Sequence, residues 1–495
     1  MSFTGKQVIG GIGWSYAERM VAQAVSLIVS VVLARILIPE DFGIITIVMI
    51  FITICDAMMT GGLGNSLVQK KDVDEKDANT ILLCSIGLSL FLYVLIYLTA
   101  PLISSFFEIP LLKHVLRVLG IRVVISGINS IQRAWIQRKL QFKKFFFSTL
   151  VGVVVSAVIG IAMAKMGFGV WSLVAQYLSN AFLGTVILFI IDDWSPSFNF
   201  SWDRARSMFS YGWKVLISTV LYTIIADIKS ILIGKKFGPT DLAFFDQGNK
   251  FPNILIVNID ATIISVMFPV LSNSQTDLHN LKRMCRRSVK TCMYLVAPLL
   301  LGLLFIAQDF IMVIYTEKWM EAVPFLQPMA IFYLIRPVST MCNQSIMALG
   351  RSDISLKISI ISSIINIGML ILAVFIIGDL IWVAYLAVMA SLISASLFMV
   401  YGKKLFGYKI REQLIDILPN IGLALVMGII VYSLHFLPIN RVLVLVIQVF
   451  VGVTIYILLS FLLQIESFLY LIRIFEDKIT DKRMKNLLHK LQRSR

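Results

Sequence analysis

The stretch LARILIPEDFG (residues 33–43) decides the fold, because it separates two long apolar segments with residues that end one helix and start another. Arg35 suits a helix C-terminus and Pro39 suits the first turn of a new helix, where its missing N–H is not needed. Glu40 and Asp41 place negative charge near the positive end of that new helix. The stretch therefore predicts a tight elbow between two helices, with Gly43 just inside the second one.

The composition of the chain indicates a protein that crosses a membrane many times. Of its 495 residues, 58% are hydrophobic and 15% are charged, whereas a soluble domain has about 25% charged residues. The mean hydropathy is +0.87, and apolar runs of about 20 residues recur from end to end, as membrane-spanning helices require. No long polar segment could cover a large soluble core, which argues against that class.

The sequence favours neither an enzyme, nor a metalloprotein, nor a nucleic-acid-binding protein. It contains no GxxxxGK[ST] phosphate-binding loop, and its 5 cysteines show no CxxC spacing. The 4 histidines lie near predicted helix ends or in the tail, without metal-ligand spacing. The formal net charge of +16 is carried mainly in loops, where it reports membrane topology. We therefore expect no catalytic residue, no cofactor, no metal and no nucleic acid partner.

Apolar runs bounded by polar breaks predict an all-α polytopic membrane protein with about 14 transmembrane helices. The predicted spans are 9–34, 42–66, 79–104, 113–134, 146–165, 169–191, 209–234, 245–271, 288–308, 321–347, 355–377, 380–401, 413–434 and 441–464. We group them into an N-terminal six-helix lobe (1–200), a C-terminal six-helix lobe (201–408) and an extra helix pair (409–465). A basic amphipathic cytoplasmic tail (466–495) follows, suited to an anionic leaflet.

The distribution of Lys and Arg predicts the orientation of the spans. Roughly 28 basic residues fall on the side of the two termini and roughly 7 on the other side, which is a strong positive-inside signal. Both termini are therefore predicted to be cytoplasmic, and the elbow is predicted to face outward.

The elbow has a counterpart far down the chain. ARILIPEDFG (34–43) aligns without a gap with GKKFGPTDLA (234–243), and an Asp-Ala pair recurs in the following span as Asp56-Ala57 and Asp260-Ala261. Short Pro/Asp loops are common between helices, so a chance match is the alternative. The offset spans an even number of helices, so a true duplication predicts two parallel six-helix lobes around a central cavity.

A series of motifs in order resembles the polysaccharide transport branch of the multidrug/oligosaccharidyl-lipid/polysaccharide (MOP) exporter superfamily. Besides the elbow, these are GGLGNSLVQKKD (61–72), IQRAWIQRKLQFKKF (131–145), GFGVWSLVAQ (167–176), IGKKFGPTDLAFFDQGNKFPN (233–253), MFPVLSNSQTD (267–277), YTEKWMEAVPFLQ (315–327) and ALGRSD (348–353). The sequence departs from the family pattern at Ile38, Ala243 and Thr316, where glycine is usual. All three are predicted loop positions, so the resemblance stands.

The resemblance implies a flippase of the bacterial inner membrane. Its cargo would be an undecaprenyl-pyrophosphate-linked oligosaccharide repeat unit for O-antigen, capsule or exopolysaccharide, moved by alternating access between two lobes. Membrane lipids, a polysaccharide polymerase and a chain-length regulator would be its partners. Two alternatives stay open: a multidrug or metabolite cation antiporter of the same superfamily, and a non-transporting subunit of a polysaccharide assembly complex.

Charged residues deep inside predicted spans are the candidate site residues, because such a side chain normally faces a cavity or a partner. Arg19, Arg122 and Arg336 are predicted to line the cavity and attract pyrophosphate or acidic sugars, since guanidinium pairs phosphate oxygens bidentately. The alternative is internal ion pairing, for example of Arg19 with Glu18 or Asp56. The carboxylates are predicted to couple transport to an ion gradient or to form ion pairs; they are Glu18, Asp56, Asp227 and Asp260.

Overall fold

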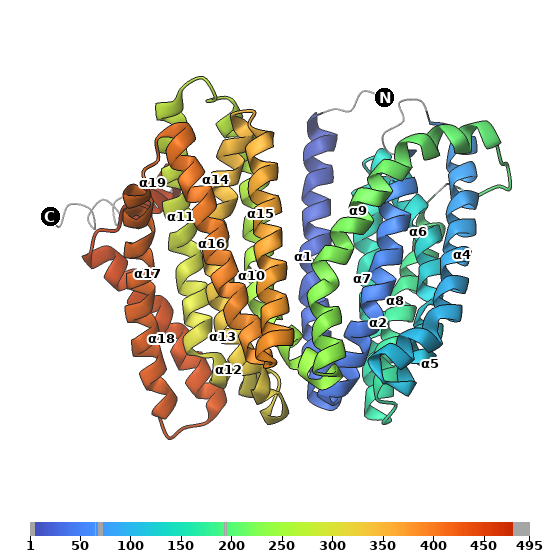
Figure 1. The fold of residues 1–495 in the computed structure, drawn as a ribbon, viewed down its shortest axis with the longest axis horizontal. Coiled ribbons are helices and arrows are strands. Elements are labelled where there is room, and N and C mark those ends of the chain that lie inside the picture. Colours follow the sequence, from blue (N-terminus) through green and yellow to red (C-terminus); the bar gives the residue numbers. More distant parts are fainter. Residues whose placement is uncertain (1–4, 65, 68–72, 193, 195, 479–495) are drawn as a thin grey trace. The chain divides into compact units, whose positions relative to one another are not determined.

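The computed structural model describes residues 5–64, 66–67, 73–192, 194 and 196–478. Secondary structure within these residues is helical, without strands, which confirms the predicted all-α fold. The chain divides into two compact units, Met1–Ala243 (unit 1) and Phe244–Arg495 (unit 2), and each is described by itself (Figure 1).

Twelve helices in the described part of the chain are long and apolar enough to cross a membrane. They correspond to twelve of the predicted spans. The other two predicted spans, 113–134 and 321–347, are each divided into consecutive shorter helices. In the second of these, Pro337 lacks an N–H and its ring would clash with the carbonyl of Tyr333 in a continuous helix. In the first, the break comes at Gly120, where a Cβ would lie 2.7 Å from the carbonyl oxygen of Leu116.

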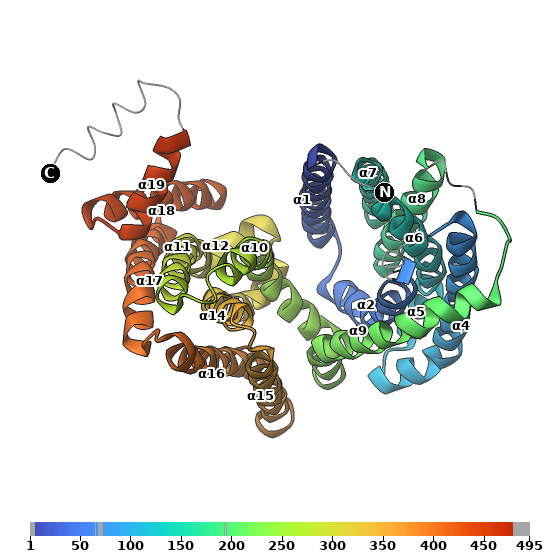
Figure 2. The same cartoon turned by 90° about the horizontal axis from the view of Figure 1, so that it is seen from above.

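Unit 1 begins with a long helix and contains both broken and continuous spans. Its elements are α1 (Gly5–Ile36), α2 (Pro39–Met58), η1 (Met59–Gly64), α4 (Glu75–Phe107), α5 (Pro110–Leu119), α6 (Ile121–Arg138), α7 (Phe142–Lys165), α8 (Val170–Ile191) and α9 (Trp202–Lys236). Helix α6 packs against α4, α7 and α8, and Figure 2 shows it among these helices. It therefore lies in the interior of the unit.

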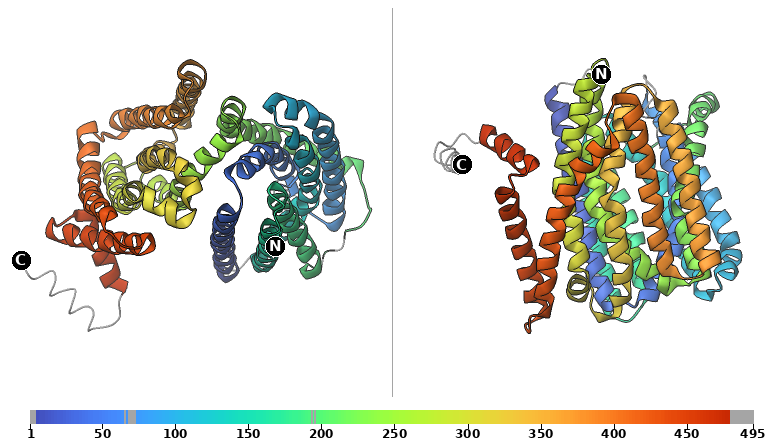
Figure 3. Two further views of the ribbon diagram at one scale, coloured as in Figure 1. Left: turned by 90° about the horizontal axis from the view of Figure 1, so that it is seen from below. Right: turned by 60° about the vertical axis from the view of Figure 1, so that its left-hand side comes forward.

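Unit 2 holds the remaining spans and the C-terminal helix pair. Its elements are the main part of α10 (Pro239–Ser272), then α11 (Leu278–Phe305), α12 (Ala307–Ile314), η2 (Glu317–Ala322), α13 (Val323–Leu334), α14 (Arg336–Ala348), α15 (Ser352–Ile371), η3 (Leu372–Ile377), α16 (Leu380–Phe406), α17 (Ile410–Ser433), η4 (Leu434–Phe436), α18 (Arg441–Leu462) and α19 (Glu466–Lys478). Helix α17 packs on α11, and α18 packs on α17 (Figure 3).

The elbow has the predicted form and a contact that the sequence does not reveal. Helix α1 ends at Ile36, and α2 begins at Pro39 with two acidic residues in its first turn. A Cβ on Gly43 would lie 1.8 Å from the carbonyl oxygen of Pro239, so only glycine permits this approach of the two backbones. Because Pro239 opens α10 in the second copy of the elbow, the two elbows pack on each other within unit 1.

Unit 1 extends beyond the predicted lobe boundary at 200/201. Helix α9 packs against α2 and η1, so the seventh predicted span belongs to the first compact unit. The division of the sequence repeat at 200/201 stays a prediction. Residues 479–495 of the predicted amphipathic tail lie outside the described residues.

A buried carboxylate fixes the C-terminal helix pair to the rest of unit 2. Asp309 in α12 accepts hydrogen bonds from Gln448 Nε2 at 2.9 Å and from an Arg441 guanidinium nitrogen at 3.1 Å. The Nδ1 atom of His435 lies 2.8 Å from the same carboxylate. These contacts join α12 to both ends of the connection between α17 and α18.

Candidate functional site

Unit 1 contains a cavity of about 670 Å³ between α1, α2, η1, α6, α7 and α8. Its volume lies in the range of pockets that bind small molecules. Its polar lining residues are Glu18, Ser26, Asp56, Thr60, Arg122, Ser126, Asn129, Ser130, Arg133, Gln137, Ser148, Thr149, Tyr177, Asn180 and Thr185. So many polar groups inside a bundle of apolar spans indicate a functional cavity, because polar groups in a membrane interior need partners or water.

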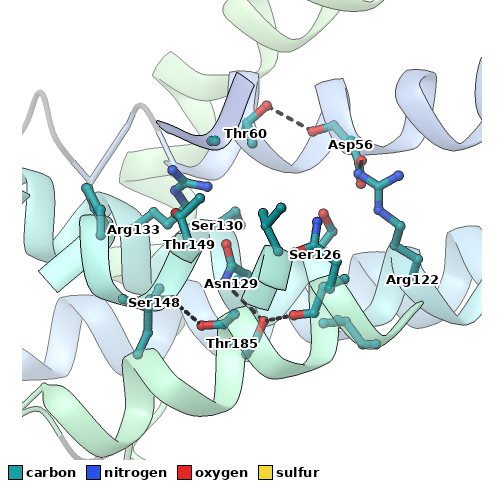
Figure 4. A pocket seen from close by; sticks show the side chains of 18 of the residues that line it. Asp56, Thr60, Arg122, Ser126, Asn129, Ser130, Arg133, Ser148, Thr149 and Thr185 are labelled. Atoms are coloured by element: carbon teal, nitrogen blue, oxygen red, sulfur yellow. Dashed lines mark hydrogen bonds and ion pairs between the residues drawn. The ribbon is translucent and has the colours of Figure 1, made fainter. Parts of the chain in front are cut away.

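One helix face supplies much of this polar lining. Arg122, Ser126, Asn129, Arg133 and Gln137 follow one another along α6 at spacings of three or four residues, which places them on one side of the helix. Arg122 and Arg133 are eleven residues apart, close to three full turns, so they lie about 16 Å apart along the axis. The cavity therefore has one guanidinium toward each end (Figure 4).

Arg122 forms an ion pair with Asp56 at one end of the cavity. The guanidinium of Arg122 lies 3.3 Å from the Asp56 carboxylate, and the two side chains are 22% and 18% exposed. Arg122 also lies 5.9 Å from the centre of the Tyr177 ring. The break after α5 places Arg122 in the first turn of α6, where it contacts Met49 and Asp56 of α2.

Arg133 and Glu18 form the second pair of charges. A guanidinium nitrogen of Arg133 lies 3.2 Å from Glu18 Oε1, which also accepts a hydrogen bond from Thr149 Oγ1 at 3.0 Å. Arg133 lies over the Phe145 ring with its Cζ 5.0 Å from the ring centre. The Glu18 side chain is 11% exposed and that of Arg133 is 49% exposed, so the arginine is the more accessible partner.

Uncharged polar groups lie between the two ion pairs. Asn129 donates a hydrogen bond to Thr185 Oγ1 at 3.0 Å, which joins α6 to α8. Ser148 on α7 donates to the Gly184 carbonyl at 2.7 Å. Figure 4 shows Asn129 and Thr185 between Arg133 and Arg122, and Ser148 beside Arg133. Hydroxyl and amide groups in such a position suit a ligand rich in hydroxyl groups.

The predicted site residues fall in different places. Arg122, Asp56 and Glu18 line the cavity, whereas Arg19 is exposed and is not part of its lining. The carboxylates that were candidate partners of Arg19 pair with Arg122 and Arg133 instead. Asp227 is half-buried on α9 and makes interactions there.

Unit 2 repeats the pairing of Asp56 with Arg122. The Arg336 Nε atom lies 2.5 Å from the carboxylate of Asp260, which also accepts a hydrogen bond from Thr340 at 3.2 Å. In each unit the aspartate lies on the helix that follows the elbow, α2 or α10, and the arginine begins the second part of a broken span. An aspartate–arginine ion pair therefore occurs in both units.

Sequence reasoning missed Arg133, Asn129 and Thr149 as cavity residues. Arg133 lies at the end of the predicted span 113–134, where a basic residue is typical of the loop charges that set topology. The available signal was the spacing along α6: residues 122, 126, 129, 133 and 137 form a polar stripe along one side of the helix.

Comparisons with known proteins agree on one family. A family model described as "Polysaccharide biosynthesis protein" matches residues 32–324, more than half of the chain. The chain is 22% identical to "Succinoglycan biosynthesis transport protein ExoT" of Rhizobium meliloti, over 68% of each chain. It is 21% identical to "Lipopolysaccharide biosynthesis protein WzxC" of Escherichia coli, over 74% of this chain and 75% of WzxC. It is 24% identical to "Teichuronic acid biosynthesis protein TuaB" of Bacillus subtilis, over 71% of this chain and 73% of TuaB.

Solved transporters share the fold. An inward closed structure of the lipid II flippase MurJ superposes with a TM-score of 0.70 at 17% identity, covering 91% of this chain and 98% of MurJ. An inward-facing MATE family transporter of the MOP superfamily gives a TM-score of 0.60 at 15% identity, covering 79% of this chain and 97% of the transporter. From the matched family model, we conclude that the chain belongs to the polysaccharide biosynthesis protein family and is a multi-pass membrane protein.

Proposed function

We propose that the protein is a flippase that moves an undecaprenyl-pyrophosphate-linked oligosaccharide across the bacterial inner membrane by alternating access. The observation that carries this proposal is the polar cavity of unit 1, with its two arginines and its lining of hydroxyl and amide groups. The proposal is supported by relatives named as polysaccharide biosynthesis and transport proteins and by the fold shared with a lipid II flippase. The glycan would serve O-antigen, capsule or exopolysaccharide synthesis.

Arg122 and Arg133 would recognise the diphosphate of this cargo. Guanidinium groups stay charged at any physiological pH and present paired N–H donors to phosphate oxygens. In the cavity each guanidinium forms an ion pair with a carboxylate, Arg122 with Asp56 and Arg133 with Glu18. A diphosphate would compete with these carboxylates, so binding would exchange one ion pair for another and avoid leaving a charge unpaired.

The displaced carboxylates would link transport to an ion gradient. When the diphosphate pairs with Arg122, the Asp56 carboxylate loses its positive partner and gains affinity for a proton or Na⁺. Asp260 has the same relation to Arg336 in unit 2. Arg336 is the more accessible partner there, with 44% exposure against 6% for Asp260. We propose the same exchange for this pair, and we keep Arg19 and Asp227 as candidate residues of the transport pathway.

Transport by purified protein in vesicles tests the proposal. The full chain is reconstituted with a fluorescent undecaprenyl-pyrophosphate oligosaccharide, and its movement between leaflets is followed by quenching from outside. Arg122→Ala and Arg133→Ala are expected to slow transport at least about 10-fold, the effect of losing one charge-assisted hydrogen bond. Lys165→Ala, an exposed change at the end of α7, is the matched control. Wild-type rates in both arginine variants would exclude the cavity arginines as cargo ligands.

The same vesicles separate the alternative functions. The carboxylates Glu18 and Asp56 in the cavity favour a cation antiporter as the second candidate. Ethidium efflux driven by a proton or Na⁺ gradient, without movement of the lipid-linked sugar, would support the antiporter. Absence of both activities, together with co-purification with a polysaccharide polymerase or a chain-length regulator, would support a non-transporting subunit.

The proposed orientation places both termini in the cytoplasm and the elbow outside. Roughly 28 basic residues on the terminal side against roughly 7 on the other support it. Ile38 in the elbow is 53% exposed, so Ile38→Cys should react with a membrane-impermeant maleimide added to intact spheroplasts. Reaction only after the membrane is opened would reverse the orientation.

A further inference from the structure

A second cavity, in unit 2, carries an excess of positive charge that the transport proposal does not use. It has a volume of about 860 Å³ and lies between the first half of α11, the start of α17 and helix α19. Its lining residues are His279, Lys282, Arg283, Arg286, Arg287, Lys290, Thr291, Glu412, Glu466, Ser467, Leu469, Tyr470 and Arg473. Lysine and arginine therefore far outnumber carboxylates in its wall.

Three of the basic residues are already matched by carboxylates. Lys282 lies 2.7 Å from Glu412. Arg286 makes two hydrogen bonds to Asp416, at 2.7 and 2.9 Å. Lys290 lies 3.3 Å from Asp416 and 2.5 Å from Glu466. These contacts hold α17 and α19 against α11.

Arg283, Arg287 and Arg473 are the remaining cations of the cavity. Within the described part of the chain none of them forms an ion pair, and all three are exposed. The Arg287 Cζ atom lies 3.4 Å from the centre of the Tyr470 ring, so the ring holds the guanidinium in place on α19. Arg283 donates a hydrogen bond through one guanidinium nitrogen to Asn280 Oδ1 at 2.7 Å. Each guanidinium thus keeps N–H groups free to donate.

Helix α19 forms one wall of this cavity and is itself firmly attached. Phe468 and Leu471 pack against the hydrophobic core of unit 2, and the Phe468 ring centre lies 6.3 Å from that of Tyr294. The opposite side of the helix presents Tyr470 and Arg473 to the cavity. An amphipathic helix directly after a membrane span suits the membrane surface, where lipid headgroups lie.

We propose that this cavity binds a phosphate-bearing anion, and that the anion is the headgroup of an acidic lipid. Three guanidinium groups around one space match the bidentate geometry of phosphate oxygens. The cavity lies at the end of spans α11 and α17, beside an amphipathic helix, which favours a lipid headgroup over a soluble phosphate compound. The site is separate from the cavity of unit 1, so the proposal does not depend on the proposed function.

Native mass spectrometry of the full-length protein in detergent tests the proposal. Phosphatidylglycerol, phosphatidylcholine or sodium pyrophosphate is added, and the bound fraction is measured at increasing concentration. Phosphatidylglycerol is expected to bind at least about 10-fold more tightly than phosphatidylcholine. The triple variant R283A/R287A/R473A should weaken phosphatidylglycerol binding about 100-fold, because each basic residue near an anionic surface strengthens binding about five-fold.

The triple variant K403A/K404A/R411A is the matched control. It removes the same number of positive charges from exposed positions outside the cavity. These positions lie in the last turn of α16 and the first turn of α17. Equal loss of binding in the two triple variants would overturn the proposal, because the effect would then be general surface charge. The variant R283K/R287K/R473K is a second test in case the alanine variant misfolds. It keeps the three positive charges but lacks the paired guanidinium donors, so its affinity for phosphatidylglycerol should still fall at least about three-fold. Pyrophosphate binding as tight as that of phosphatidylglycerol would contradict the lipid assignment.

Discussion

Removing either member of the Asp56–Arg122 pair should destabilise unit 1 more than removing both. Asp56→Ala leaves the Arg122 guanidinium without its carboxylate, and Arg122→Ala leaves the carboxylate alone. Both side chains are about one-fifth exposed, so an unpaired charge would be only partly hydrated. The double variant Asp56→Ala/Arg122→Ala leaves neither charge behind.

The size of the coupling follows from the geometry. At 3.3 Å and an effective dielectric constant of about 20, the attraction between the two charges is about 5 kcal/mol. Desolvation of the two ions offsets a large part of this attraction, which leaves a net coupling of about 2 kcal/mol. For a unit of this size, each kcal/mol shifts the melting temperature by about 2–4 °C. Each single variant should therefore melt about 4–8 °C below the wild type.

A double-mutant cycle on the detergent-solubilised protein measures this coupling. The double variant should melt no lower than either single variant. If the two single shifts instead add up in the double variant, the pair is not coupled and the reasoning fails. Transport adds a second readout: a double variant that regains stability but stays inactive would assign the Asp56–Arg122 pair a role in transport beyond holding α2 and α6 together.

Three further predictions concern other parts of the fold. Gly43→Ala should destabilise the protein by about 1–3 kcal/mol and lower its melting temperature, because the new Cβ clashes with Pro239 in the second elbow. The control Gly87→Ala has open space around its Cβ and should not lower the melting temperature. Equal effects of the two variants would exclude the clash. The hydrogen bond from Arg204 lowers the pKa of Asp74. The Asp74 carboxylate therefore adds to the free energy of unfolding at neutral pH, and this contribution is lost as the pH falls through its lowered folded-state pKa. The melting temperature of Asp74→Ala should accordingly lie below that of the wild type at pH 7, with the gap narrowing below about pH 4; a constant gap would contradict this. Asp309→Ala should cost about 2 kcal/mol and speed limited proteolysis in the loop at 437–440, because the helix pair loses its buried anchor; an unchanged cleavage rate would argue against the anchor.

Much of the fold could be predicted because the bilayer imposes long apolar helices. Twelve predicted spans are continuous helices in the structure, and the elbow begins α2 at Pro39. The breaks within 113–134 and 321–347 were missed because hydropathy averages over a window and does not register a local kink. Pro337 was a visible signal for the second break, whereas Gly120 was not, since glycine is common in membrane helices.

The candidate site was harder to predict than the fold. Arg122, Asp56 and Glu18 were identified because an ionisable residue deep in a span needs a partner or a cavity. Which carboxylate pairs with which arginine depends on how α1, α2 and α6 pack, and no pattern within one helix contains that information. Arg133 was missed because a basic residue near the end of a span has the same appearance whether it sets topology or lines a cavity.

The contact between Gly43 and Pro239 has a consequence for how the protein is made. Chains emerge from the ribosome with the N-terminus first, and early segments fold before later ones exist. The first elbow cannot reach its final packing until residue 239 has been synthesised, when nearly half of the chain is complete. Helix α9, which covers α2, arrives equally late. The first helices therefore stay incompletely packed in the bilayer until this point. A side chain at residue 43 would block their final packing, so it should lower the yield of folded protein.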